Sequence, residues 1–333
     1  MLELRDVVLK AGAEPIRHTF ADGRISVVLG RNHSGKTLLT RVLAGLEQPV
    51  AGELFQDEAS LAGLGPGTRS VALVYQSFVN YPNWTVRQNL ASPMVAAKLD
   101  REAIESRVRD IAGKLGLSAL LDRYPHTLSG GQQQRLAIGR ALAKGARVLV
   151  MDEPLVNLDY KLRESLQQEL RTLLHELGQS VIYTTSDPRD AFALGDELVL
   201  LADHAVLQSG APLAVYVEPI SPASADLMSD PRANRLPGKT PVLVRPEHLY
   251  LTSHAADDAA FPVTVLGRET NGSDTFLHCR LADASGDGSG DATHWVARLA
   301  GLEDLPPGST CTLFAPRASL LRFDGDQGVR GLG

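Results

Sequence analysis

The feature that most constrains this chain is the glycine-rich segment Gly30–Thr37, which reads GRNHSGKT. It fits the pattern G-x-x-x-x-G-K-[ST] of a phosphate-binding loop. The apolar run Ile25–Leu29 before it predicts a buried strand, and residues 38–45 after it predict a helix that ends at a glycine. This order directs backbone N–H groups at a phosphate. We expect Lys36 to neutralise the terminal phosphates and the Thr37 hydroxyl to hold Mg²⁺.

Composition narrows the classes of partner and compartment. The 333 residues are 44% hydrophobic and 22% charged, with a net charge of −6 and no long basic run. We therefore expect a globular protein that does not bind nucleic acid. Cys279 and Cys311 lack metal-ligand spacing, so packed thiols in a reducing compartment are expected. The chain starts without a secretory signal and contains no run of eighteen apolar residues, so any membrane span is expected to come from another chain.

The order of the predicted elements indicates two folded parts. Strand-like and helix-like stretches alternate up to about residue 218, which is typical of a parallel α/β sheet. Prolines between residues 219 and 241 predict a linker, and short strand-like runs beyond it predict a small β-barrel. We expect a nucleotide-binding α/β domain over residues 1–222, a linker over 223–239 and a smaller all-β domain over 240–333.

A second glycine-rich helix start lies at Leu128–Arg135, with the sequence LSGGQQQR. Ser129 is placed to cap the helix, and Gln132 completes the spacing of a capping box. Gly130 and Gly131 leave the helix N-terminus free of side chains, so a phosphate could approach its N–H groups. An ordinary glycine-flanked helix start is the alternative. It does not account for the whole run beside a phosphate loop and an Asp-Glu pair at a strand end.

Together these segments resemble the ATP-binding cassette (ABC) ATPases. Leu128–Arg135 is similar to the signature motif of that family, and Val148–Pro154 resembles its Walker B strand. The resemblance covers roughly residues 1–218 and implies a P-loop NTPase fold with ATP and Mg²⁺. The tail resembles the TOBE β-barrel of carbohydrate-importer ATPases such as the maltose-importer one, chiefly through Val244–Leu249. Asn80–Pro82 is similar to the same subfamily.

The resemblance assigns roles to individual residues. Asp152 would hold Mg²⁺ through water, and Glu153 would polarise the attacking water; a helix-capping carboxylate is the weaker alternative for Glu153. Gln76 stands at the Q-loop, and Leu158–Asp159 matches the D-loop. In the family two domains close face to face, so that the signature of each serves the nucleotide of the other. The expected catalytic residues are Glu153, Lys36, Ser186 and Gln76, and the metal ligands are Thr37, Gln76 and Asp152. The expected nucleotide contacts are Gly30, Arg31, Asn32, His33, Ser34, Gly35, Lys36, Thr37, Leu38, Ser129, Gly130, Gly131, Gln132 and Asp159.

Four positions depart from the pattern of the family. Ser186 stands where the family has a histidine that contacts the γ-phosphate, and a serine is shorter and cannot become cationic. His33 occupies a usual glycine position of the phosphate loop, where we expect a tolerated side chain; rescue of the missing histidine is the weaker alternative. Val156 replaces the D-loop serine. No aromatic residue for stacking on adenine is evident around residues 10–13. Because stacking on a base is worth about 1–3 kcal/mol, we expect a modest affinity for nucleotide.

These departures affect the site on this chain's own phosphate loop, whereas the signature is intact. We therefore expect a heterodimer with a second, less altered ATPase subunit. The alternatives are a homodimer that hydrolyses ATP slowly and a set of harmless substitutions.

The resemblance implies an ATP-hydrolysing subunit on the cytoplasmic face of the membrane. It would energise an importer of sugars or polyols, glycerol among them, with transmembrane permease subunits and a periplasmic or extracellular substrate-binding protein. Tyr81 and Trp84 lie on the segment that faces the membrane subunits in the family, and ordinary packing is an equal alternative for them. Two rival functions are a catalytically weak regulatory subunit and a soluble ABC ATPase of translation or DNA repair. The second rival is disfavoured because the chain has one cassette and no coiled-coil insertion.

Overall fold

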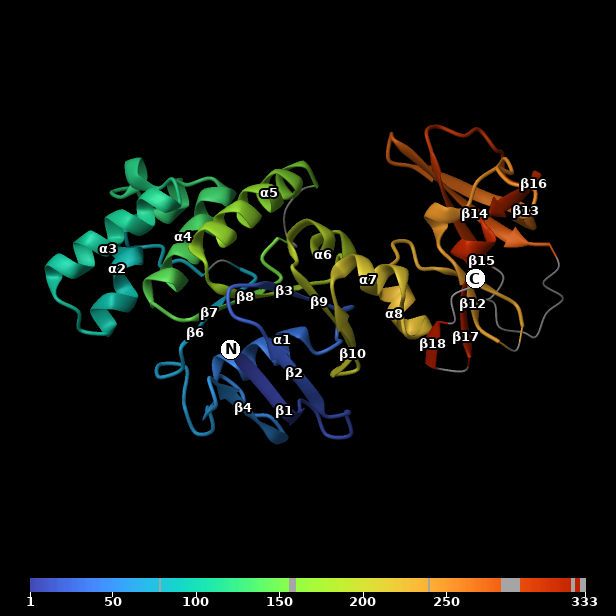
Figure 1. The fold of residues 1–333 in the computed structure, drawn as a ribbon. Coiled ribbons are helices and arrows are strands. Elements are labelled where there is room, and N and C mark those ends of the chain that lie inside the picture. Colours follow the sequence, from blue (N-terminus) through green and yellow to red (C-terminus); the bar gives the residue numbers. More distant parts are fainter. Residues whose placement is uncertain (78, 156–159, 239, 283–293, 325–326, 330–333) are drawn as a thin grey trace. The chain divides into compact units, whose positions relative to one another are not determined.

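The computed structural model describes residues 1–77, 79–155, 160–238, 240–282, 294–324 and 327–329. The chain divides into two compact units, Met1–Pro212 and Leu213–Gly333 (Figure 1). The segment 223–239, expected as a linker, contains the strand β11 (Asn234–Leu236) and most of the helix α8 (Pro222–Leu227). The three-part division of the sequence remains a prediction.

The first unit is organised around a six-stranded sheet with the order β10-β9-β3-β8-β7-β6. Five strands are parallel, and β10 pairs antiparallel with β9 at the edge. The strands are β3 (Ile25–Leu29), β6 (Val71–Val74), β7 (Val148–Asp152), β8 (Ser180–Thr185), β9 (Glu197–Ala202) and β10 (Ala205–Gly210). Every residue of β3, β7 and β8 is buried, as the uninterrupted apolar character of central parallel strands predicts. The predicted parallel α/β sheet is thereby confirmed.

A second, antiparallel sheet with the order β2-β1-β4-β5 lies in the same unit. Its strands are β1 (Leu2–Val8), β2 (Ile16–Phe20), β4 (Ala51–Gln56) and β5 (Ala59–Ser60). Side chains from both sheets and from α1 (Lys36–Ala44) form one buried core. Within it Leu39 and Leu43 of α1 are almost completely buried. Packing on both sheets therefore holds α1, and with it the end of the phosphate loop, in place.

The remaining helices of the unit lie around the main sheet. They are α2 (Val86–Ala96), α3 (Arg101–Lys114), α4 (Gly130–Ala143), α5 (Tyr160–Leu177) and α6 (Pro188–Leu194), with short 3-10 turns at Ser118–Leu120 and Pro125–Thr127. Figure 1 shows α2, α3 and α4 gathered at one end of the unit. A Cβ atom at Gly139 of α4 would lie 2.6 Å from a terminal methyl group of Leu90 and 2.7 Å from one of Leu115, so a larger residue there would displace these side chains.

The second unit is built from two antiparallel four-stranded sheets, β11-β12-β17-β18 and β15-β14-β13-β16. Its further strands are β12 (Val242–Val244), β13 (Ala259–Thr270), β14 (Asp274–Leu281), β15 (His294–Ala300), β16 (Thr310–Ala315), β17 (Leu321–Asp324) and β18 (Gln327–Val329). Trp295 is fully buried at the centre of its core. Cys279 and Cys311 are free thiols, and burial raises the pKa of Cys279 to about 12. The predicted all-β character is confirmed, with two short helices, α7 (Pro212–Val217) and α8, preceding the strands.

The segment Val244–Leu249, which carries the resemblance to the TOBE barrel, ties the start of this unit to its strands. Arg245 is 2% exposed; its Nε donates to Ser229 Oγ at 3.2 Å and its Nη2 to the carbonyl of Tyr216 at 2.6 Å. The guanidinium lies 3.7 Å above the Tyr216 ring, and the Tyr216 hydroxyl donates to Glu247 at 2.6 Å. The polar groups of a buried arginine need hydrogen-bond partners. The bonds from Arg245 to Ser229 and Tyr216 therefore connect this motif to the helical segment at the start of the unit.

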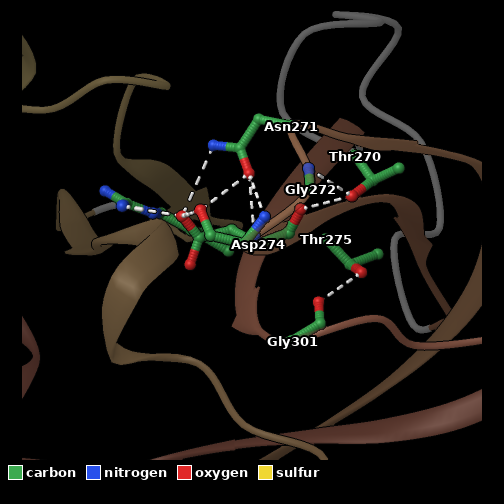
Figure 2. A network of polar contacts seen from close by, with 8 residues as sticks. Thr270, Asn271, Gly272, Asp274, Thr275 and Gly301 are labelled. Atoms are coloured by element: carbon green, nitrogen blue, oxygen red, sulfur yellow. Dashed lines mark hydrogen bonds and ion pairs between the residues drawn. The ribbon is translucent and has the colours of Figure 1, made fainter.

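The turn between β13 and β14 is stabilised by its own side chains (Figure 2). Asn271 Oδ1 accepts hydrogen bonds from the backbone N–H groups of Ser273 and Asp274, at 3.0 and 2.8 Å. Thr270 Oγ1 donates to the Asp274 carbonyl at 2.9 Å, and Gly272 has a φ of 95°. Such side-chain to backbone bonds, with a glycine in the left-handed region, close a tight hairpin. All of these groups are satisfied locally.

Candidate functional site

The phosphate loop lies at the carboxyl edge of the main sheet. Because β3 is flanked by β8 and β9, and β7 follows β8, the segments leaving these strands meet at one edge. A cavity of about 540 Å³ opens there. It is lined by Lys10, Asn32, His33, Gly35, Lys36, Thr37, Leu38, Gln76, Glu153 and His204. The structure therefore brings together predicted residues from the loop, from the end of β7 and from the segment after β6.

The loop depends on two backbone positions with a left-handed conformation, His33 with a φ of 67° and Gly35 with a φ of 105°. It also depends on Gly30, where a Cβ atom would lie 2.3 Å from Ser34 Oγ and 2.5 Å from the carbonyl of Leu201. Gly30, Arg31 and Ser34 do not line the cavity. They form its backbone support, with Ser34 buried.

Lys36 is 4% exposed and already has three partners. Its Nζ donates to the carbonyls of Gly30 at 2.6 Å and Arg31 at 2.8 Å, and lies 3.1 Å from Glu153 Oε1. A buried ammonium needs such compensation because its transfer from water is costly. A phosphate entering the cavity would meet this cation and the uncapped N-terminus of α1, whose first residue is Lys36.

Thr37 and Asp152 provide adjacent hard oxygen atoms. Thr37 Oγ1 donates to Asp152 Oδ1 at 3.4 Å, and Thr184 Oγ1 of β8 donates to the same atom at 3.0 Å. Burial raises the pKa of Asp152, and the two hydroxyl donors oppose that shift. Hydroxyl and carboxylate oxygens suit Mg²⁺, which usually takes one or two protein ligands and completes its shell with water and phosphate. This donor set fits the expected metal.

Glu153 occupies an unusual backbone conformation directly after β7, with a φ of 45°. Its N–H donates to Thr184 Oγ1 at 3.1 Å, so the same threonine supports both acidic residues. Non-glycine residues with a positive φ cost roughly 1–3 kcal/mol and cluster at functional sites. The turn directs the Glu153 carboxylate to Lys36 across the cavity. Thr184 was not among the predicted residues, since its hydroxyl reads as part of an ordinary strand.

The other predicted residues of this region fall into three groups. Gln76 is exposed and lines the cavity. Ser186 is exposed just after β8 and does not line it. Val156, Leu158 and Asp159 lie outside the described residues.

The second glycine-rich segment has the predicted conformation. Ser129 caps α4, and the capping box with Gln132 is complete, with the Gln132 N–H 3.3 Å from Ser129 Oγ and the Ser129 N–H 3.0 Å from Gln132 Oε1. A Cβ atom at Gly130 would have nothing within 4 Å, whereas Gly131 is buried. None of these residues lines the cavity at the phosphate loop. The fold keeps the two glycine-rich segments of one chain at separate places.

A second surface feature is an apolar groove of about 340 Å³ beside β6 and α4. Its lining includes Leu46, Tyr75, Val79 and Tyr81, all large apolar side chains that are substantially exposed. Arg140 lies 4.0 Å from the Tyr81 ring centre and donates to the carbonyl of Val79.

The segment that carries Tyr81 and Trp84 is held from below by a buried asparagine. Asn89 is fully buried; its Oδ1 accepts from the Tyr81 N–H at 2.8 Å, and its Nδ2 donates to the Trp84 carbonyl at 3.0 Å. The Tyr81 and Trp84 rings contact each other at 4.5 Å between centres, and both remain over 40% exposed, at 41% and 43%. The two rings also pack on each other, and Arg140 lies over Tyr81, so contact with membrane subunits and ordinary packing both stay predictions for this segment.

Comparisons with known proteins show the family to which the chain is similar. A family profile described as "ABC transporter" matches residues 13–156, and one described as "TOBE domain" matches residues 242–323. Two sn-glycerol-3-phosphate import ATP-binding proteins are similar to the chain. The one from Chromohalobacter salexigens is 36% identical, over 91% of this chain and 87% of the relative. The one from Cereibacter sphaeroides is 35% identical over 99% of each.

Further similarity extends to another import protein and to a solved structure. The xylose/arabinose import ATP-binding protein of Haloferax volcanii is 32% identical, over 95% of this chain and 88% of the relative. The dimeric ATP-binding cassette MJ0796, solved with ADP and phosphate, is 26% identical with a TM-score of 0.54, over 64% of this chain and 99% of that one. Among the described residues, no helix is both long enough and apolar enough to cross a membrane.

Proposed function

Because the chain belongs to the ATP-binding subunits of ABC transporters, we propose that it hydrolyses ATP at the cavity beside Gly30–Thr37 to drive an importer of sugars or polyols. The observation that carries the proposal is the convergence of Lys36, Thr37, Asp152 and Glu153 at one sheet edge. Hydrolysis of a phosphoanhydride needs charge neutralisation, a metal clamp and a positioned water. Lys36 offers the positive charge, Thr37 and Asp152 offer the metal ligands, and Glu153 offers the group that positions water.

The proposed roles follow from the contacts of each residue. Lys36 exchanges its bonds with the Gly30 and Arg31 carbonyls for the β- and γ-phosphates. Thr37 and Asp152 would hold Mg²⁺, which would supply charge neutralisation at the phosphates. Glu153, once Lys36 moves to phosphate, has a free carboxylate to orient the attacking water and accept its proton. Gln76, on the exposed segment after β6, reports the state of this site to neighbouring subunits.

The signature on α4 is proposed to serve a nucleotide held by a partner. This proposal is supported by the separation of Ser129–Gln132 from the chain's own cavity and by the open surface at Gly130. The finer proposal is that the partner is a second, different ATPase subunit. It rests on Ser186 and His33, which alter this chain's own site while its signature is unaltered. Purification of the native complex with this chain as its sole ATPase would contradict the heterodimer and leave the hydrolysis proposal intact.

The groove beside β6 is the proposed docking surface for transmembrane permease subunits at the cytoplasmic face of the membrane. Exposed apolar side chains of this kind mark sites of protein interaction. Tyr81 and Trp84 add two further exposed rings next to the groove. Their rigid support by Asn89 suits a recurrent contact. The permease would in turn receive substrate from a periplasmic or extracellular substrate-binding protein.

The substrate class is proposed from the relatives. Two of them carry names that specify import of sn-glycerol 3-phosphate, and one carries a name that specifies xylose and arabinose. A small polyol, its phosphate ester or a pentose is therefore the proposed cargo. An uptake assay with radiolabelled glycerol, glycerol 3-phosphate and xylose in cells with and without the gene tests this choice directly.

The hydrolysis proposal is tested by phosphate release from the purified chain, with Mg²⁺, beside Glu153→Gln and Ser186→His. Hydrolysis that Glu153→Gln abolishes supports an active site on this chain. A second candidate function, a nucleotide-binding regulatory subunit, is favoured by the exposure of Ser186 away from the cavity. That function predicts ATP binding without hydrolysis, and gain of hydrolysis in Ser186→His would locate the defect at residue 186.

A further inference from the structure

His204 is a residue of the phosphate cavity to which the sequence assigned no role. It lies in the tight turn between β9 and β10, where Asp203 and His204 both have a positive φ, of 47° and 66°. The His204 N–H donates to the carbonyl of Ser34 at 2.9 Å. This bond attaches the turn directly to the phosphate loop, so the position of the imidazole is coupled to the position of the loop.

The imidazole of His204 packs on the backbone of Gly35. A Cβ atom built on Gly35 would lie 2.6 Å from His204 Nδ1, so glycine is required there partly to admit this ring. Nδ1 is buried without a hydrogen-bond partner among the described residues. His204 therefore packs on the phosphate loop and also lines the cavity that a nucleotide would enter.

The order of the strands indicates which part of a nucleotide would meet His204. Gln76 follows β6 and Glu153 follows β7, which lie on one side of β3, whereas His204 follows β9 on the other side. The phosphate that is attacked must lie near Glu153. The rest of the nucleotide then extends across the loop toward the β9 side of the cavity, which His204 lines.

We propose that the His204 imidazole contacts the ribose and base of ATP, in place of the aromatic residue that is missing around residues 10–13. The inference rests on the proposed ATP site. An imidazole has a flat π-face that can stack on a base, as other aromatic side chains do. Lys10 also lines the cavity but has no aromatic face, and His33 lines it from the phosphate loop itself.

Two variants separate the ring from the backbone of the turn. Asparagine tolerates a positive φ, so His204→Asn removes the ring and keeps the turn. His204→Phe keeps an aromatic face without the nitrogen atoms. Asp203→Asn is the matched control, because Asp203 belongs to the same turn, also has a positive φ, and does not line the cavity. Thermal unfolding of each protein checks that it is folded.

The test is calorimetric titration of the full chain with ATP and, separately, with inorganic tripolyphosphate. We expect His204→Asn to weaken ATP binding about tenfold, which corresponds to about 1.4 kcal/mol, and to leave tripolyphosphate binding unchanged. His204→Phe should recover most of the loss, and Asp203→Asn should bind both ligands normally. Equal weakening of ATP and tripolyphosphate, or no weakening of either, would overturn the inference. If the unaltered chain binds neither ligand, the proposed function itself fails.

Discussion

Helix α1 begins directly after Gly35 and helix α4 begins at Gly130, and the two helix starts differ in how their N–H groups are capped. α1 has no side-chain cap, so no side chain occupies the N–H groups at its start where a phosphate would bind. α4 is capped by Ser129 and is complete without one. Around α1 the fold adds a cation, two carboxylates and a cavity, whereas the start of α4 presents only an open surface.

The difference indicates that the phosphate site at α1 is formed within one chain, whereas the site at α4 requires a nucleotide held by a partner subunit. The α1 site contains charges that have to be balanced before the ligand arrives, which accounts for the internal bonds of Lys36. The α4 site contains no charged residue from Ser129 to Gln132, so it has nothing to balance. Loss of a residue should therefore affect nucleotide binding by the chain itself at α1, and hydrolysis only in the assembled complex at α4.

The largest expected effect is on hydrolysis at the α1 site. Glu153→Gln removes the acceptor for the proton of the attacking water, and general-base catalysis contributes typically 10²–10⁴-fold. We expect a fall in phosphate release of about that size in the complex with permease, with ATP binding retained. Glu102→Gln, an exposed change in α3, is the control. Unchanged hydrolysis in Glu153→Gln would mean that the α1 site is not the active one.

A pair of alanine substitutions compares the two helix starts directly. In Gly30→Ala the new Cβ would clash with Ser34 and Leu201, and overpacking costs about 1–3 kcal/mol. We expect reduced stability in urea unfolding and weaker ATP binding. In Gly130→Ala the Cβ meets nothing within 4 Å, so stability and ATP binding of the isolated chain should be unchanged while hydrolysis in the assembled complex falls. Equal effects of both substitutions on the isolated chain would remove the distinction.

The caps of α4 and α2 give a smaller and more selective comparison. Ser129 and Thr85 each form a complete capping box, with Gln132 and Gln88. Replacing either cap by alanine should cost about 1 kcal/mol of unfolding free energy. Only Ser129→Ala should also lower hydrolysis in the complex beyond what the loss of stability accounts for. A similar loss of hydrolysis in Thr85→Ala would show that Ser129 acts only as a cap.

The smallest expected effect concerns the stability of the nucleotide-free chain, in which the Asp152 carboxylate is buried. Burial raises the pKa of Asp152, so the folded chain binds this proton more tightly than the unfolded chain. That contribution to stability is present at low pH and is lost as the pH rises through the raised pKa. Asp152→Asn should therefore raise the unfolding temperature of the nucleotide-free chain at neutral pH, and the gain should shrink on acidification.

The same substitution should remove the additional stabilisation that Mg²⁺ gives to the ATP complex. Asp122→Asn, at a position 88% exposed, is expected to change neither quantity. A lower unfolding temperature for Asp152→Asn at neutral pH would indicate that the charged carboxylate stabilises the empty site.

Much of the fold could be predicted because its signals are local. The apolar runs that became β3, β7 and β8 and the helix that ends at Gly45 depend on residues close together in the chain. The placement of β3 between β8 and β9 could not be predicted, because pairing between distant strands leaves no local pattern. The reversal of β10 at the sheet edge is of the same kind.

The residues of the site can likewise be divided into those with a local sequence signal and those placed by the pairing of distant strands. Lys36, Thr37, Asp152 and Glu153 belong to short motifs with a fixed chemical meaning, and the structure brings them together. His204 was missed since nothing in its own turn indicates that β9 lies beside the phosphate-loop strand. The role of Thr184, which supports both acidic residues, likewise becomes visible only when β7 and β8 are seen side by side.

The internal bonds of Lys36 have a kinetic consequence for the proposed cycle. In the empty site the ammonium is bonded to two carbonyls and paired with Glu153, so the carboxylate is engaged until a terminal phosphate draws the lysine away. Binding of ATP would thus release the carboxylate that accepts a proton from the attacking water. After the γ-phosphate departs, the same carbonyls and carboxylate compete with ADP for the lysine. Each round would then end with the protein's own groups accelerating the departure of the product.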